Sequence, residues 1–196
     1  MLNQTFFEKI DGEEKAYWLG FLFADGCITS QSRIALNLQE KDQVHINQFA
    51  QIFGRKCYSF INDAGNLMYA VRLNSPFLWN SLFQLGLRPR KSLKDITSTF
   101  DNVPLNYMHH FIRGIFDGDG CLTKSENQLR LYFTGFKPNL GKIGKIVSGA
   151  LGVNNPTIHS YSGKADHIYW GGNKQVPKIL DWLHGDATIY LKRKSI

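Results

Sequence analysis

The sequence predicts an α+β fold made of two similar halves that are related by a pseudo-twofold axis. Two observations predict it: an internal repeat that spans the chain, and a common order of helical and strand patterns in both copies. Segment 18–27 returns as segment 112–121, so that Asp119 stands 94 residues after Asp25 in a chain of 196. A repeat of this length indicates a duplicated structural unit. We expect one half at 1–98 and the other at 99–196, with a polar linker at about 94–106.

Each copy is expected to run helix, two strands, helix, two strands, helix. Residues 33–38 and 128–133 alternate apolar and polar side chains, which is typical of strands with one buried face. Residues 44–53 place apolar side chains at helical spacing and are followed by a glycine, which indicates the end of a helix. Turn-forming residues at 62–66 and at 162–163 predict a second strand pair in each copy.

Closing helices are expected at 77–85 and 176–183, where apolar residues again follow helical spacing. Each half then has an αββαββα order. Its four strands are expected to form an antiparallel, saddle-shaped sheet with one apolar face toward the helices.

The two repeated segments carry small residues four positions apart, Gly20 with Ala24 and Gly114 with Gly118. Four residues make about one helical turn, so each pair forms a small-residue stripe on one helix face. Such stripes let two helix backbones approach closely. We therefore expect the repeated helices to pack against each other between the halves.

A carboxylate follows each small-residue stripe directly. Asp25 and Asp119 are expected to end their helices, with Gly26 and Gly120 as left-handed C-terminal caps. A carboxylate at a helix C-terminus opposes the helix dipole. Two carboxylates about 4 Å apart also repel by about 4 kcal/mol at an effective dielectric constant near 20. A shared hard divalent cation offsets both costs, and oxygen ligands suit Mg²⁺.

These segments resemble the paired signature motifs of LAGLIDADG homing endonucleases, in the form where one chain carries both copies. The motif falls on residues 18–26 and 112–120, and each copy matches four of its nine letters. The matching residues are Gly20, Ala24, Asp25, Gly26, Gly114, Asp117, Asp119 and Gly120. The first copy has Phe23 where the second has the motif's earlier acid, Asp117.

The resemblance implies a role for five residues. Asp25 and Asp119 would bind the catalytic metals, and Lys91 and Lys194, which share an Arg-Lys-Ser context, would be the basic residues near the two active sites. Glu40 would position water in the first copy. Its counterpart falls near a glycine, at position 135, so the two active sites are expected to differ.

The activity that the resemblance implies is site-specific cleavage of double-stranded DNA. The enzyme would hydrolyse phosphodiesters on both strands of a long, asymmetric target with Mg²⁺ and leave short 3′ overhangs. Mn²⁺ or Ca²⁺ is expected to substitute for Mg²⁺ in binding. Two alternatives stay open on the same fold: an intron RNA maturase and a DNA-binding regulator that does not cut. The presence of both acids and both lysines favours the endonuclease.

The polar positions of the predicted strands are candidates for contact with DNA. Their side chains are suited to base edges and phosphates, and a solvated face would be richer in Lys and Glu. The candidates are Arg33, Asn37, Gln39, Arg72 and Asn74 in the first half, and Arg130, Tyr132, Thr134, His167 and Tyr169 in the second.

Composition agrees with a nucleic-acid partner. The chain has 23 Lys and Arg against 16 Asp and Glu, a net charge of +7, which favours binding to a polyanion. Its three cysteines form no CxxC motif, so we expect an intracellular, reducing compartment. We expect no secretory signal and no membrane span. Because two internal copies complete the twofold arrangement, the chain is expected to be a monomer.

Overall fold

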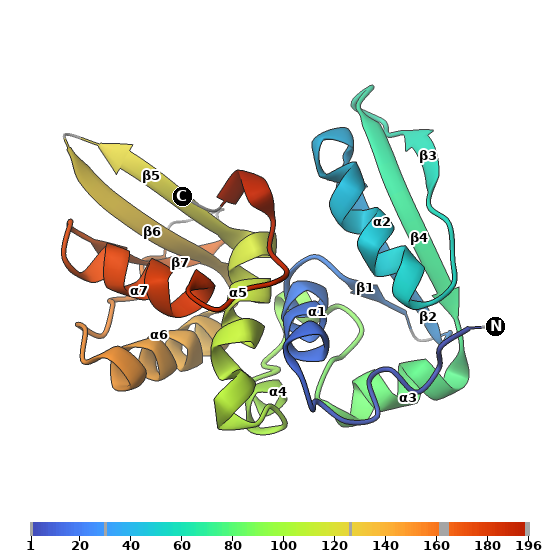
Figure 1. Ribbon diagram of the computed structural model, residues 1–196, viewed down its shortest axis with the longest axis horizontal. Coiled ribbons are helices and arrows are strands. Elements are labelled where there is room, and N and C mark those ends of the chain that lie inside the picture. The colour runs from blue at the N-terminus through green and yellow to red at the C-terminus, as the bar shows by residue number, and fades with distance from the viewer. Residues whose placement is uncertain (1, 30, 126, 161–164, 195–196) are drawn as a thin grey trace.

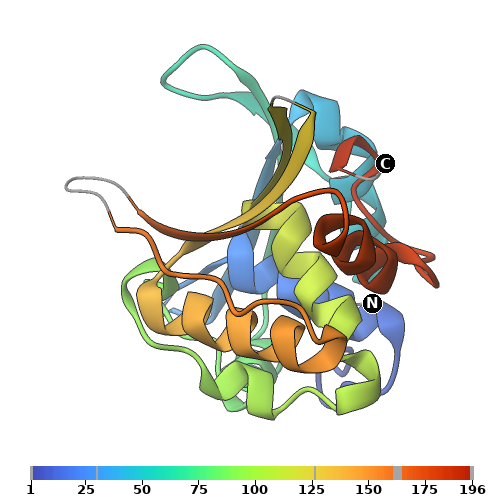
Figure 2. The ribbon, with the colours of Figure 1, turned by 90° about the vertical axis from the view of Figure 1, so that its left-hand side faces the viewer.

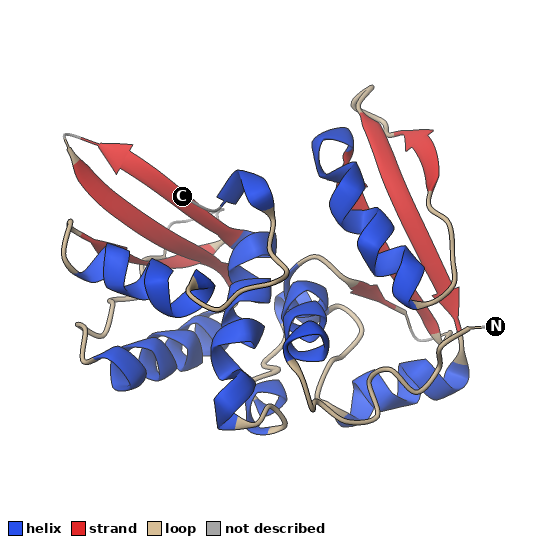
Figure 3. Ribbon diagram, viewed as in Figure 1, coloured by secondary structure: helices blue, strands red, loops and turns tan. Residues whose placement is uncertain are grey.

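The computed structural model describes residues 2–29, 31–125, 127–160 and 165–194. Two helices, α1 (Glu13–Ala24) and α5 (Met108–Asp119), lie side by side at the centre of the molecule (Figure 1). A sheet lies to either side of this pair (Figure 3). The predicted α+β class and its arrangement in two halves are confirmed.

The first half follows the predicted order closely. After α1 come β1 (Cys27–Ile28), β2 (Arg33–Gln39), α2 (Gln43–Ile52), β3 (Tyr58–Ile61), β4 (Leu67–Asn74) and α3 (Pro76–Gln84). The strands form one antiparallel sheet in the order β1-β2-β4-β3. The four-stranded sheet predicted for this half is therefore correct.

The second half repeats the order with one difference. After α5 come β5 (Gly120–Ser125), β6 (Gln128–Gly135), α6 (Lys137–Leu151), β7 (Asp166–Gly171) and α7 (Gln175–His184). The strands pair antiparallel in the order β5-β6-β7. Figure 2 shows α6 on one side of this curved sheet. The predicted hairpin turn at 162–163, and Ser195 of the second Arg-Lys-Ser sequence, lie outside the described residues.

The fourth strand predicted for the second half is wrong within the described residues. In its place one isolated bridge pairs His159 with His167. Pro156 has no N–H to donate to a strand ladder. The carbonyl oxygen of Asn154 is used by side chains, since it accepts from Trp170 Nε1 at 2.8 Å and from Ser148 Oγ at 2.9 Å. This segment therefore follows the sheet without extending it.

The α1–α5 contact is as close as the small residues predicted. A Cβ atom added to Gly20 would overlap the carbonyl oxygen of Phe111, and one added to Gly114 would overlap that of Tyr17. The two helices thus touch backbone to backbone. No larger residue fits at either glycine without moving the helices apart.

The prediction of left-handed caps at Gly26 and Gly120 is wrong. Neither has a positive φ, and Gly120 is extended, with φ −88° and ψ 162°. Both positions require glycine for a steric reason instead. A Cβ at Gly26 would lie 2.6 Å from the carbonyl oxygen of Leu22, and one at Gly120 would lie 2.5 Å from that of Phe116. The chain turns so tightly from helix into strand that a side chain would strike the helix it has left.

The segment between the halves is more ordered than its polar sequence suggested. It contains the short helix α4 (Ser98–Asp101) and buries Ile96, Phe100 and Val103. The Phe100 ring lies 5.4 Å from that of Phe23 on α1 and 5.1 Å from that of Phe111 on α5. The linker therefore packs against the central helix pair. In the described part of the chain, no helix combines the length and apolar character needed to span a membrane.

The backbone contact between α1 and α5 predicts that a Gly→Ala substitution has opposite effects on stability at two positions. Gly20→Ala is expected to lower the free energy of unfolding by about 1–3 kcal/mol, because the added methyl group forces the central helices apart. Gly149→Ala, on α6 where a Cβ would meet no atom within 4 Å, is expected to raise it by about 0.5–1 kcal/mol. Urea denaturation of both variants checks this. A Gly20→Ala variant as stable as Gly149→Ala would contradict the close helix contact.

Candidate active site

The two acids lie at the same end of the central helix pair. Asp25 caps α1, its N–H donating to the Phe21 carbonyl oxygen at 2.9 Å, and Asp119 is the last residue of α5. A Cβ placed on Gly118 would lie 3.4 Å from Asp25 Oδ2. The carboxylate of the first half therefore lies against the helix of the second.

The surroundings of these acids disfavour their charged forms. Both side chains reach solvent, but the protein around them removes part of their hydration. This desolvation raises the pKa of Asp25 above its ordinary value, against the effect of Lys91 and Lys194. Desolvation, and then the charge of Asp25, raises the pKa of Asp119 to about 6. Two carboxylates that repel each other in this way can both be ionised at lower cost when a cation lies between them.

A lysine lies at the C-terminus of each motif helix. Lys91 Nζ donates to the carbonyl oxygen of Ala24, at the end of α1. Lys194 Nζ donates to the carbonyl oxygens of Phe116, Gly118 and Gly120, at 3.1, 2.9 and 2.7 Å. Each ammonium group donates to a carbonyl oxygen in the last turn of its motif helix, Ala24 or Gly118, and opposes the negative end of the helix dipole.

Asp25, Asp119, Lys91 and Lys194 form a single charged group, called here the acid–lysine cluster. Desolvation lowers the pKa of both lysines, and the two aspartates oppose that shift in each case. The structure thus brings together the four residues that the repeat singled out. Two hard carboxylate oxygen donors at one point are a donor set that fits Mg²⁺.

Glu40 is not part of this cluster. It begins a short 3₁₀ turn after β2 and is exposed. Among the described residues, no hydrogen bond or ion pair joins it to the cluster. In the second half, Thr134 and Gly135 at the end of β6 line a cavity of about 60 Å³ together with Lys91 and Asp119. Gly135 brings no side chain to this cavity, so the two ends of the cluster have different neighbours.

The exposure of the strand candidates agrees with the predicted outward faces, and their contact with DNA stays a prediction. All five candidates in the first half are exposed, whereas Ile34, Leu36 and Leu38, which alternate with them on β2, are buried. In the second half Thr134 and Tyr169 are exposed, and Arg130, Tyr132 and His167 are partly exposed. Since β1 and β5 begin directly after α1 and α5, the acid–lysine cluster lies where the two sheets start.

Two further residues of these faces escaped the sequence analysis. His159 stacks on His167 and on Tyr169, with ring centroids 5.3 Å apart in both cases. Tyr132 continues the row, 5.2 Å from Tyr169. In the first half Tyr58, 41% exposed, lies under the Arg72 guanidinium at 5.4 Å. In the described residues His159 makes an isolated bridge with His167 and belongs to no strand, so it falls outside the segments that alternate.

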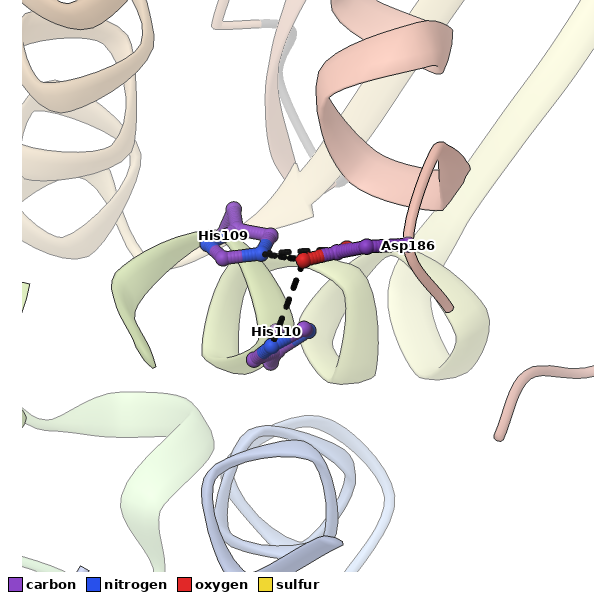
Figure 4. A group of neighbouring side chains, drawn as sticks. All are labelled: His109, His110 and Asp186. Carbon is purple, nitrogen blue, oxygen red and sulfur yellow. Dashed lines mark hydrogen bonds and ion pairs between the residues drawn. The ribbon is translucent and has the colours of Figure 1, made fainter. Parts of the chain in front are cut away.

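A second group of polar side chains lies at the opposite end of α5 and has the composition of a metal site. Asp186 lies 3.1 Å from His109 Nε2 and 3.9 Å from His110 Nε2 (Figure 4). However, His110 Nδ1 accepts a hydrogen bond from Arg113 at 2.8 Å. Because guanidinium can only donate, the neutral ring carries its proton on Nε2 and offers no lone pair there. The group is therefore a hydrogen-bonded cluster and not a metal centre.

Comparison with known proteins finds similarity at the level of the fold. No known protein-family profile and no curated protein sequence matches the chain. The meganuclease I-SmaMI, bound to an uncleaved DNA target in the presence of calcium ions, is 14% identical over 90% of this chain and 86% of its own, with a TM-score of 0.56. The I-LtrWI LAGLIDADG homing endonuclease, bound to target DNA, is 11% identical over 97% and 87%, with a TM-score of 0.58.

A third match is the N-terminal LAGLIDADG domain of DUF199/WhiA. It is 14% identical over 92% of this chain and 86% of its own, with a TM-score of 0.57. The chain has the LAGLIDADG fold. The LAGLIDADG fold occurs both in endonucleases and in WhiA, so the fold alone does not indicate an activity.

The raised pKa of Asp119 predicts a pH-dependent effect on stability. The folded pKa of about 6 lies above the ordinary value of 3.8, so without metal the penalty on the folded state grows as the pH rises from about 3.8 and is complete above about 6. Asp119→Asn is expected to raise Tm at pH 7.5, and the gain should shrink as the pH falls to 4.5. Thermal melts across this range check it. Asp63→Asn, at an exposed position in the β3–β4 turn, is the control and should leave Tm unchanged; an equal gain there would contradict the prediction.

Proposed function

We propose that the chain is a sequence-specific endonuclease that cuts both strands of a DNA duplex with a divalent cation, Mg²⁺ in the first instance. One observation carries the proposal. The acid–lysine cluster places two carboxylates and two ammonium groups at the junction of two sheets whose polar faces are open. Phosphodiester hydrolysis needs this combination: oxygen ligands for metal, positive charge near the phosphate, and a surface that holds the duplex in register.

Each residue of the cluster has a role in this chemistry. Asp25 and Asp119 would hold the cation, which when bound supplies an activated water and stabilises negative charge on the phosphate. Lys91 and Lys194 would neutralise the charge that develops on the phosphoryl oxygens and order the water around them. The lysines are preorganised for this, because each is already fixed by carbonyl oxygens of a motif helix.

The dimensions of the sheets indicate the size of the target. A strand of eight residues, the length of β4 and β6, spans about 26 Å or about 8 base pairs. Two sheets then read about 16 base pairs or more. The first half presents Arg, Asn and Gln, whereas the second presents a row of aromatic rings. The two half-targets should therefore differ, with hydrogen bonds to base edges prominent in one and apolar contacts in the other.

The structural matches support this proposal through what they bind. I-SmaMI and I-LtrWI were solved on DNA targets, and I-SmaMI with calcium ions. The two halves of this chain would together occupy one duplex, so a monomer is the proposed active form. The short 3′ overhangs that the family resemblance implies are part of the proposal.

Metal binding can be tested without any DNA. Mg²⁺ or Ca²⁺ is expected to raise the Tm of the wild type, because a ligand that binds only the folded state at 100 times its Kd stabilises it by about 2.7 kcal/mol. Asp25→Asn and Asp119→Asn should lose most of this increase, and Asp63→Asn should keep it. An equal increase in all four proteins would show that the cation binds elsewhere.

Cleavage is the deciding test. Random duplexes of about 20 base pairs would be enriched for binding to the protein in Ca²⁺ and then incubated in Mg²⁺. We expect double-strand cuts in an asymmetric sequence, abolished by EDTA. Asp25→Asn and Asp119→Asn should each reduce the rate by about 10²–10³-fold.

Two outcomes would contradict the proposal. Tight, sequence-specific binding with no cut in Mg²⁺ or Mn²⁺ would indicate a DNA-binding regulator. Absence of any DNA preference would direct the search to intron RNA.

A further inference from the structure

The segments that carry the two lysines cross from one half of the molecule to the other. The first crossing segment, 91–96, follows the closing helix of the first half, and the second, 188–194, follows that of the second half. The first segment is hydrogen-bonded to α6 in the second half. The second segment is hydrogen-bonded to the turn that leads into α2 in the first half. The contacts are made by Asn139 on α6 and by Asp42 directly before α2.

Asp42 holds the second crossing segment through an ion pair. Its carboxylate accepts from Arg193 Nε at 2.8 Å and from Arg193 Nη2 at 2.9 Å. The two hydrogen bonds fix the plane of the guanidinium as well as its distance. Asp42 is 5% exposed, so its position is set by the packing of the first half. Lys194 is the next residue along the chain.

Two more contacts tie this segment to the central helices. Leu191 N–H donates to Asp117 Oδ2 at 2.7 Å, and the Tyr17 hydroxyl donates to the same oxygen at 2.7 Å. Further back, Glu13 accepts from Thr188 N–H at 2.8 Å. Acids of both halves therefore guide the chain from residue 188 to the cluster.

The first crossing segment is held differently, by one neutral side chain. Asn139 Oδ1 accepts from Ile96 N–H at 3.1 Å, and Asn139 Nδ2 donates to the Lys94 carbonyl oxygen at 3.3 Å. Asn139 is 5% exposed. Arg90, which occupies the position equivalent to Arg193, is exposed.

We propose that Asp42 and Asn139 are positioning residues, each of which sets the lysine of one active site from the opposite half and so controls the cutting of one DNA strand. This inference rests on the proposed function. Among the described residues, no hydrogen bond or ion pair joins Asp42 or Asn139 to the acids of the cluster. Each acts by fixing the backbone that delivers an ammonium group to a motif helix, and displacement of such a group by about 1 Å is enough to slow a reaction 10²-fold.

The test uses the full chain and a duplex with a different dye on each strand, so that the two nicks are timed separately. Lys194→Met and Lys91→Met first show which strand depends on which lysine. Asp42→Asn is expected to slow the Lys194-dependent strand by about 10–100-fold and the other strand by less than about 2-fold. Asn139→Ala should produce the reverse. Asp101→Asn removes an exposed ion pair with Lys142 and is the matched control, expected to change neither rate.

A second measurement separates local positioning from general damage. Amide hydrogen exchange of the free protein should rise in 188–194 for Asp42→Asn and in 91–96 for Asn139→Ala, with the other segment unchanged. A double variant, Asp42→Asn with Arg193→Gln, restores a neutral hydrogen bond and should recover part of the lost strand rate.

Several results would overturn the inference. The inference fails if Asp42→Asn and Asn139→Ala slow the same strand, if either slows both strands equally, or if their rates match those of Asp101→Asn. It also fails if amide hydrogen exchange rises in both segments together. A wild type that cuts neither strand overturns the proposed function, and the strand assignment with it. A wild type that cuts normally while the variants behave like the control overturns the positioning role alone.

Discussion

The backbone contact between α1 and α5 is the constraint on which the rest of the structure depends. Gly20 and Gly114 carry no side chain at the crossing, so each lies directly against a backbone carbonyl of the other helix. Their C-terminal ends are thereby brought together, and with them Asp25 and Asp119. The strands that follow start from that point and diverge into two sheets. One steric condition thus sets both the location of the charges and the origin of the open polar surface.

The electrostatics of the cluster follow from that geometry. The two carboxylates lose hydration and also repel each other, which is why the pKa of Asp119 rises to about 6. The charges of Lys91 and Lys194 offset only part of this cost, since desolvation has the larger effect on both aspartates. A divalent cation between the two carboxylates would offset this repulsion.

Sequence reasoning predicted what the repeat itself encodes. The helix pair, Asp25 and Asp119, and the alternation of the strands follow from local pattern and duplicated position. Features that depend on partners far along the chain were out of reach: Asp42 and Arg193 are 151 residues apart, and no local pattern marks their pairing. The role predicted for Gly26 was wrong, since this glycine avoids a steric clash and does not adopt a left-handed conformation. In the described part of the second half, the predicted fourth strand is absent where the carbonyl oxygen of Asn154 accepts from side chains.

Fusion of two copies into one chain gives each copy a different neighbour at the same motif position. The linker between the halves has no second copy, and its Phe100 packs on Phe23 of the first motif. The equivalent place in the second motif meets the carboxy-terminal segment, and there Asp117 binds the N–H of Leu191. A dimer of identical subunits must use one residue for both surroundings. A covalent connection removes that symmetry requirement, so the peptide that joins the halves also frees them to diverge.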